Sequence, residues 1–442
     1  MVKPHPLRYG IALAVGIASM AAAVLGLVQL LIRIPLRTDN WVLLIAVSVL
    51  SVFLVILVTR YLVLLWLGYL QHLESRISEP LPAETALPPV TILVPAYNEG
   101  RVIGEAIASL LALDYPAYEI LVIDDGSTDD TREVVARLEG RHGDVTVRLV
   151  SKTNSGKASA LNTGLALARH DFVLCMDSDS KLTPGTLRAA IRHFADPRVA
   201  AVAGNVKVAN RRNLWTRLQA LEYIEGLNMA RRAQGFLRVV NIVPGPVGVF
   251  RREVLVEVGG YDTDTFAEDA DLTLKLLTAG WHIVYEDGAQ AWTEAPEKLL
   301  DLLKQRYRWT RGILQALRKR ATWLVLPRHG AGIWVSLNLM FFEAILWPAA
   351  NVIGNALFAV VALAAGAGEY VVYWWLLLTL LDLMAALYTI AMEEESLALV
   401  PYAIIYRFFF IVVIDVAKLL ATVEEFLGVR MTWGKLQRAG ER

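Results

Sequence analysis

Long apolar runs at both ends of the chain, on either side of a polar middle, constrain the fold of this sequence more than any other feature. Residues 11–34 are almost uncharged, and residues 41–70 are interrupted only by Arg60. Each run exceeds the roughly 20 residues with which a helix crosses a bilayer. The whole chain is 55% hydrophobic and 19% charged, whereas soluble domains are about 45–50% apolar and about 25% charged. We therefore expect a membrane protein with two transmembrane helices in residues 1–78.

The last quarter of the chain is apolar again. Residues 333–366 form one long run with a single acid, Glu343, and an expected break at Pro348, and the runs 370–392 and 397–427 follow. Residues 331–428 would thus hold three membrane helices, or four if Pro348 divides the long run. Basic residues near both ends favour cytoplasmic termini, which need an even number of crossings. The total of five or six crossings leaves this open.

Net charge and cysteine content exclude some classes of function. The 43 basic and 43 acidic residues balance, so no electrostatic argument favours a nucleic-acid partner. The single cysteine, Cys175, excludes an intramolecular disulfide and a metal–thiolate cluster. Because Cys175 lies in a strand-like run, we expect a buried thiol without a reactive role.

The middle of the chain, residues 88–325, predicts an α/β domain. Short apolar runs rich in β-branched residues alternate with segments that have the apolar spacing of helices. Strands are expected at 90–95, 119–123, 145–150, 171–176 and 281–285, and helices at 102–111 and 129–138. This alternation favours an open, mainly parallel sheet, in which ligands bind beyond the carboxyl ends of the strands.

Acidic pairs follow two of these strands. Asp177 and Asp179 flank one serine, so both carboxylates can reach a single Mg²⁺ or Mn²⁺ ion beside the phosphates of a nucleotide. Asp124 and Asp125 precede Gly126, and their expected role is to hold uracil and ribose by hydrogen bonds. A solvated acidic turn is the alternative for the first pair, and a plain exit from the strand is the alternative for the second.

Residues further along could supply the other groups that sugar transfer needs. Lys157 could pair with a phosphate or be a solvated loop lysine. Attack by a sugar hydroxyl needs a general base, and either Asp269 or Glu268 fits, because a neighbouring acid raises the pKa of a carboxyl group. Arg308 could hold the leaving diphosphate with two hydrogen bonds, and Trp309 could stack on a sugar ring.

Two stretches are both amphipathic and basic, residues 213–236 and residues 299–323. Such helices can lie at a membrane surface with the apolar face in the lipid. The alternative is that their apolar faces pack on the α/β domain.

In their order along the chain, these motifs resemble the processive family-2 glycosyltransferases, which have the GT-A fold. The matching segments are Val94-Pro95-Ala96-Tyr97-Asn98-Glu99, Asp124-Asp125-Gly126-Ser127, Asp177-Ser178-Asp179, Glu268-Asp269 and Gln305-Arg306-Tyr307-Arg308-Trp309. The last is a complete Q-x-x-R-W and is the most specific of them. Among members of the family, the chain is most similar to poly-N-acetylglucosamine synthases, above all over residues 281–312.

The resemblance implies a role for each of these residues. Asp269, with Glu268 beside it, would be the base that deprotonates the acceptor hydroxyl. Asp179, with Asp177, would hold the metal and the diphosphate. The residues implied in donor and nucleotide binding are Pro95, Tyr97, Glu99, Asp124, Asp125, Lys157, Asp177 and Asp179, and those implied at the acceptor and diphosphate site are Gln305, Arg308 and Trp309.

The resemblance also implies an activity and a location. A UDP-sugar, with UDP-N-acetylglucosamine as the expected donor, would be polymerised with inversion into a β-linked exopolysaccharide that leaves through the membrane helices. The catalytic domain would lie on the cytoplasmic side of the inner or plasma membrane. Expected partners are the UDP-sugar, the growing polysaccharide and the lipid bilayer; a small accessory membrane subunit is left open.

Other functions stay open at this stage. The synthase could use UDP-glucose or two donors. A transferase that moves one sugar onto a lipid carrier is a second reading, although such enzymes usually lack Q-x-x-R-W. The third reading is a membrane transporter or an inactive scaffold, against which the intact acids Asp125, Asp179 and Asp269 argue.

Overall fold

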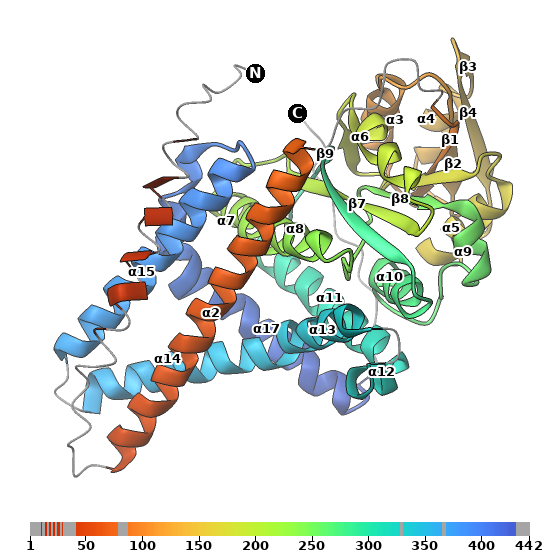
Figure 1. Ribbon diagram of the computed structural model, residues 1–442. Helices are drawn as coiled ribbons and strands as arrows, with labels where there is room; N and C mark the ends of the chain where they lie inside the picture. Colours follow the sequence, from red (N-terminus) through yellow and green to blue (C-terminus); the bar gives the residue numbers. More distant parts are fainter. Residues whose placement is uncertain are drawn as a thin grey trace.

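The computed structural model describes residues 41–77, 87–327, 330–364 and 368–429, together with a few residues before 41. An α/β domain lies at one end of the molecule, and long apolar helices extend from it to the other end (Figure 1). The expected architecture, an α/β domain between two helical apolar regions, is therefore confirmed. Most of the first expected span, residues 11–34, falls outside the described residues.

The α/β domain is built on a nine-stranded sheet with the order β3-β4-β2-β1-β5-β8-β7-β9-β6. The strands β4, β2, β1 and β5 are parallel, but β8 runs antiparallel to both of its neighbours, as β3 and β6 do to theirs. The sheet is thus mixed, but β7 and β9 pair in parallel, so six of its nine strands run in one direction, as expected for a mainly parallel sheet, and only β3, β8 and β6 run in the other. The strands are β1 (Val90–Ala96), β2 (Tyr118–Asp124), β3 (Gly140–His142), β4 (Val145–Ser151), β5 (Phe172–Cys175), β6 (Ser180–Leu182), β7 (Val199–Val208), β8 (Gly248–Arg251) and β9 (His282–Thr293).

Helices cover both faces of this sheet, which explains why β1 and β2 are buried along their whole length. Alternate side chains of β1 enter different cores: Ile92 and Val94 pack on one side and Leu93 on the other. The domain's helical segments are α3 (Ile103–Leu111), α4 (Thr131–Ala136), α5 (Lys157–Leu167), α6 (Thr186–Ile191), η1 (Arg192–Ala195), α7 (Leu214–Glu222), η2 (Tyr223–Asn228), α8 (Met229–Phe236), α9 (Arg252–Glu257), α10 (Glu268–Thr278), α11 (Leu299–Lys319) and α12 (Ala321–Val325).

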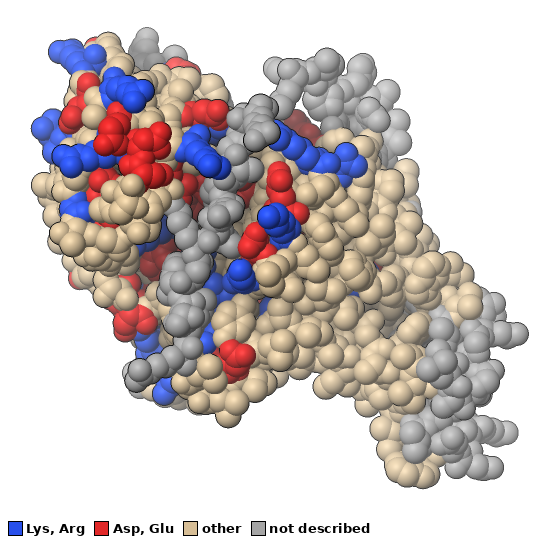
Figure 2. Space-filling model, turned by 180° about the vertical axis from the view of Figure 1, so that it is seen from behind, with Lys and Arg blue, Asp and Glu red and all other residues tan. Residues whose placement is uncertain are grey.

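Four helical segments of the described chain are long and apolar enough to cross a membrane: Leu44–Ser75, Ala331–Val360, Trp375–Met392 and Leu397–Phe426. Figure 2 shows the charged side chains gathered over the α/β domain, whereas the apolar helices present a face almost without charge. The elements concerned are α2 (Trp41–Ile77), α13 (Ala331–Phe341), η3 (Phe342–Leu346), α14 (Trp347–Ala364), α15 (Gly368–Met392), η4 (Leu397–Leu399), α16 (Tyr402–Ile405), η5 (Tyr406–Ile411) and α17 (Val412–Phe426).

Pro348 does not break the long apolar run into two helices. Helical structure continues from α13 through η3 into α14. The segment before the proline, Phe342–Leu346, is a π-helix. Proline has no backbone N–H and cannot donate the usual helical hydrogen bond, and the wider π-helical turn accommodates this loss without ending the helix.

The acids in the apolar helices have partners on neighbouring helices. Glu343 accepts two hydrogen bonds from Arg60, at 2.6 and 2.9 Å. Asp382 pairs with Arg407 and also accepts a hydrogen bond from Tyr61. Such pairing reduces the cost of burying a charge among apolar helices, so these acids join helices that are far apart in sequence.

The best-buried residues of the basic stretch 213–236 pack on the domain and on the apolar helices α2 and α15, and the location of this stretch at a membrane surface stays a prediction. Leu218 and Leu221 are fully buried in the core. Arg232 is only 1% exposed and forms ion pairs with Glu393 at 2.8 Å and Asp287 at 3.1 Å. These residues therefore join α8 to β9 and to the loop that follows α15.

Candidate active site

A pocket lies beyond the carboxyl ends of β1 and β5, where ligands bind in sheets of this kind. Its walls come from the end of β1, the start of α5, the residues after β5, the loop 243–245 and the start of α10. The lining residues that the sequence singled out are Pro95, Lys157, Asp177, Glu268 and Asp269. Residues of the Asp-Ser-Asp motif and of the Glu-Asp pair therefore line the same pocket.

The ammonium group of Lys157 joins the two acidic parts of this pocket. Its Nζ atom lies 2.6 Å from Oδ1 of Asp177 and 2.8 Å from Oε1 of Glu268. Burial opposes the charge, yet the pKa of Lys157 is raised well above its ordinary value because Asp177, Glu268 and Asp269 surround it. Lys157 is the first residue of α5, and although its side chain is 38% exposed, its ion pairs place positive charge between two carboxylates.

Asp269 lies in the first turn of α10. Its pKa is raised to about 6, first by burial and then by the charge of Glu268, while Lys157 opposes the shift. Its Oδ1 atom accepts a hydrogen bond of 2.8 Å from the backbone N–H of Ala270. A carboxyl group of this pKa is ionised at neutral pH and is more basic than an ordinary aspartate, which suits proton abstraction.

Asp125 organises the loop that leads to Lys157. Its carboxylate, only 3% exposed, accepts hydrogen bonds from the backbone N–H groups of Ser155 and Gly156 and pairs with Lys152 at 2.7 Å. Asp124 is also buried and accepts a hydrogen bond from the N–H of Ser127 at 3.0 Å. Both acids thus shape the turns at the ends of β2 and β4, where a nucleotide would lie.

The other residues expected to bind the donor surround the same end of the sheet. Tyr97 follows β1 and is 39% exposed. The backbone N–H of Glu99 donates to Thr131 Oγ1 at 2.7 Å, which ties the turn after β1 to α4. Asp179 lies between β5 and β6 and accepts a hydrogen bond from the hydroxyl of Ser180. These three residues lie outside the lining of the pocket itself.

The Q-x-x-R-W segment lies on α11, and its key residues share one face of that helix. Gln305, Arg308, Trp309 and Gly312 have the spacing i, i+3, i+4 and i+7. Gln305 is buried and accepts a hydrogen bond of 2.8 Å from Arg306. Arg306 in turn lies over the ring of Trp309, with 4.2 Å between its guanidinium carbon and the ring centroid.

The same face of α11 touches the start of α10. A Cβ atom on Gly312 would lie 2.5 Å from the Cβ of Ala267 and 2.5 Å from its backbone nitrogen. Gln315 reinforces this contact by accepting a hydrogen bond of 3.1 Å from the N–H of Phe266. Because Ala267 immediately precedes Glu268 and Asp269, α11 is packed directly on the acidic end of the pocket.

Several lining residues were not identified from the sequence. One of them is Gly245, where a Cβ atom would lie 2.7 Å from Oδ2 of Asp177 and 3.0 Å from Nζ of Lys157. The turn-forming run Pro244-Gly245-Pro246 was the available signal. Tyr261, another lining residue, donates a hydrogen bond to the sulfur of Cys175. Cys175 is buried, as expected, and this burial raises the pKa of its thiol to about 11.

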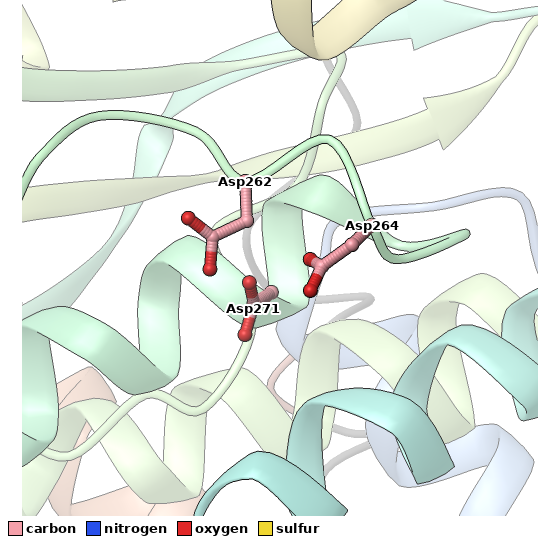
Figure 3. Close-up of side chains that lie close together, drawn as sticks. All are labelled: Asp262, Asp264 and Asp271. Carbon is pink, nitrogen blue, oxygen red and sulfur yellow. The ribbon is translucent and has the colours of Figure 1, made fainter.

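A second acidic cluster, Asp262, Asp264 and Asp271, lies beside α10 (Figure 3). The ammonium group of Lys319 pairs with all three carboxylates, and Arg320 adds a second cation to Asp271 at 2.5 Å. Because cations of the protein already compensate these acids, the cluster is an ion-pair network that fastens the end of α11 to α10.

Comparisons with known proteins find similarity over the α/β domain. Residues 88–312, just over half of the chain, match the family described as "Glycosyltransferase like family 2". Poly-beta-1,6-N-acetyl-D-glucosamine synthase from Staphylococcus aureus (strain COL) is 35% identical over 224 residues, which cover 50% of this chain and 54% of that protein. The synthase of the same name from Staphylococcus epidermidis is 32% identical over 257 residues, or 58% and 61%. The chain thus matches little more than half the length of these relatives.

A solved structure supports the fold. A mannosyltransferase from Pyrobaculum calidifontis in complex with GDP-Man and Mn²⁺ superposes with a TM-score of 0.60, covering 86% of this chain and all of that one. At 24% identity, this likeness concerns the arrangement of the elements alone.

Proposed function

The chain belongs to the family-2 glycosyltransferases, and from that premise we propose that it polymerises N-acetylglucosamine from UDP-N-acetylglucosamine into a β-linked exopolysaccharide. The observation that carries the proposal is the pocket in which Lys157, Asp177, Glu268 and Asp269 meet while α11 packs on the start of α10. The relatives named poly-beta-1,6-N-acetyl-D-glucosamine synthase support this choice of sugar and product.

The proposed reaction is a single displacement with inversion. Oxygen of the acceptor hydroxyl forms a bond to the anomeric carbon, and its proton passes to the carboxylate of Asp269. The bond from that carbon to the diphosphate oxygen breaks, and UDP leaves with the electron pair. A base with a pKa of about 6 can accept the proton at neutral pH and release it to water afterwards.

The carboxylates after β5 fit a divalent cation. Asp177 and Asp179 offer the hard oxygen ligands that Mg²⁺ and Mn²⁺ prefer, and Asp177 already faces the ammonium group of Lys157. A bound cation would neutralise charge on the diphosphate. Lys157, released from Asp177, would then face the phosphates, while Asp124 and Asp125 hold the loops around the nucleotide.

The α11 residues would complete the acceptor side. Arg308 lies one helical turn from Gly312 and would stabilise the leaving diphosphate, for which its planar guanidinium group is suited. Trp309 would stack on a sugar ring. Gln305 would keep the Trp309 ring in position, because it accepts a hydrogen bond from Arg306, which lies over that ring.

The remaining elements of the proposal concern the membrane. The apolar helices would anchor the enzyme in the inner or plasma membrane, with the α/β domain on the cytoplasmic side, and would guide the product outward. An accessory membrane subunit would be a further partner.

The test is polymer synthesis by the full-length protein purified in detergent, with Mg²⁺ or Mn²⁺. UDP-N-acetylglucosamine, UDP-glucose and UDP-glucuronate are offered singly and in pairs, beside an Asp269→Asn control. We expect a high-molecular-weight product from UDP-N-acetylglucosamine alone and none from the control. A product that requires another donor would overturn the choice of sugar, and UDP release without polymer would contradict the polymerase activity.

A further inference from the structure

The apolar segment Leu397–Phe426 meets the composition of a membrane span, but its contacts place both of its ends beside the α/β domain. At the first end, Glu395 pairs with Arg211 at 2.6 Å, and the hydroxyl of Tyr402 accepts a hydrogen bond from Arg217. Arg211 precedes α7 and Arg217 lies within it, and buried side chains of α7 such as Leu218 and Leu221 belong to the domain core.

The other end of the segment is held near the active site. Arg311 of α11 pairs with Glu425 at 2.7 Å and donates to the backbone carbonyl of Val429 at 2.6 Å. Gln315 donates to Glu425 at 3.2 Å while its other amide atom accepts from Phe266. Two hydrogen bonds thus connect the end of α17 to the residues just before the proposed base.

A helix of 30 residues is about 45 Å long, which exceeds the thickness of a hydrocarbon core of about 30 Å. A segment that crossed the bilayer would therefore carry its second end to the opposite side from its first. In Figure 1, α17 crosses α14 and runs toward α11 and α12, whereas the distant ends of α14 and α15 lie together at the far side of the molecule.

The exposed surface of the segment suits an interface. Five large apolar side chains form one stripe at helical spacing, each between 41% and 58% exposed: Ile405, Phe409, Val416, Leu420 and Val423. Ile404 and Phe426 are also exposed but lie outside this stripe. The opposite side holds buried Arg407, Asp415 and Thr422 and the pairs with α11. An apolar stripe backed by polar contacts with the domain fits a helix that lies along the membrane boundary.

We propose that the segment Leu397–Phe426 does not cross the bilayer but lies in the plane of its near face, with the stripe of apolar side chains in the lipid and the other side supporting α11. This rests on the membrane location in the proposed function. The described crossings would then be α2, α13–α14 and α15. With the span expected at residues 11–34 they make four, the even number that basic residues near both ends favour.

The test is the labelling of single introduced cysteines by a membrane-impermeant maleimide in sealed inside-out and right-side-out vesicles. The unmodified protein is the blank, because its one cysteine is buried. Asp144→Cys marks the side of the α/β domain, and Gly368→Cys marks the start of α15. We expect Ala398→Cys and Leu427→Cys to label from the same side as Asp144→Cys, and Gly368→Cys from the other.

The proposal would be overturned if Leu427→Cys were labelled from the same side of the membrane as Gly368→Cys and from the opposite side to Asp144→Cys. If Gly368→Cys labelled with Asp144→Cys, the membrane anchoring of the proposed function would fail instead. Nitroxide labels at Phe409, Val416, Leu420 and Val423 give a second measurement of immersion depth. We expect similar depth at all four positions, and a depth that passes through a maximum along the segment would contradict an in-plane helix even if Leu427→Cys were unreactive.

Discussion

Gly312 of α11 lies so close to Ala267 that a single added methyl group would meet the Ala267 Cβ at 2.5 Å. This contact joins the helix that carries Gln305, Arg308 and Trp309 to the two residues that follow Ala267. The Q-x-x-R-W segment and the Glu-Asp pair are therefore held in one spatial arrangement by close packing of α11 on the residue before α10.

We expect Gly312→Ala to lower polymer synthesis at least tenfold and to destabilise the protein by about 1–3 kcal/mol, because the atoms in the way belong to the α10 start and its backbone. The measurements are kcat and the thermal unfolding midpoint. Gly104→Ala is the matched control: it also lies in a helix, and its Cβ would make only ordinary contact with Val134 at 3.5 Å. Equal behaviour of the two variants would refute the role of the contact.

Gly245→Ala should weaken binding without destabilising the fold. The new methyl group would lie 2.7 Å from the Asp177 carboxylate and 3.0 Å from the Lys157 ammonium, and both are ends of side chains that can shift. We expect a several-fold higher KM for the UDP-sugar or a weaker response to Mn²⁺, with an unchanged unfolding midpoint. Gly185→Ala, whose Cβ would meet nothing within 4 Å, should match the unmodified protein in both measurements.

The raised pKa of Asp269 predicts how activity depends on pH. With a pKa of about 6, the base is protonated at lower pH, so kcat/KM should fall about tenfold per pH unit below that value. The sign for stability is opposite. Because the folded state holds this proton more tightly than the unfolded chain, the contribution to stability is present below pH 4 and is lost as pH rises through 6.

Asp269→Asn should accordingly abolish transfer. It should also raise the thermal unfolding midpoint above that of the unmodified protein, and this increase should be larger at pH 7 than at pH 4. The pair of measurements separates a catalytic carboxylate from a structural one, because loss of a stabilising aspartate would lower the midpoint instead. A pH profile that stays flat between 5 and 7 would contradict the assignment of the base.

The two acidic clusters should differ in metal binding. We expect the unmodified protein to bind Mn²⁺ in the presence of UDP, as measured by calorimetry, and Asp177→Asn and Asp179→Asn to abolish this binding. Asp264→Asn should leave that binding unchanged, because Lys319 already compensates the charge of the second cluster. Loss of Mn²⁺ binding in Asp264→Asn with retention in Asp177→Asn would reverse the assignment of the two clusters.

The sequence alone determined the features that depend on neighbouring residues. Uniformly apolar runs showed which helices leave the α/β domain, β-rich runs located β1, β2, β4 and β5, and Cys175 was correctly expected to be buried. The family could also be identified, because its motifs are short and local. Strands β3, β6, β7 and β8 were missed, and with them the antiparallel pairs of the sheet, since pairings such as that of β5 with β8 join segments far apart in the chain.

Only the tertiary structure decided which distant groups meet. The meeting of Lys157 with Glu268 and the approach of Gly312 to Ala267 depend on packing between separate elements, which no local pattern encodes. The orientation of Leu397–Phe426 could not be predicted from the sequence for the same reason. Its composition is that of a membrane span, and only tertiary ion pairs such as that of Glu425 with Arg311 show where its ends lie. Hydropathy reports how apolar a helix is, whereas its direction is set by the side chains that hold its two ends.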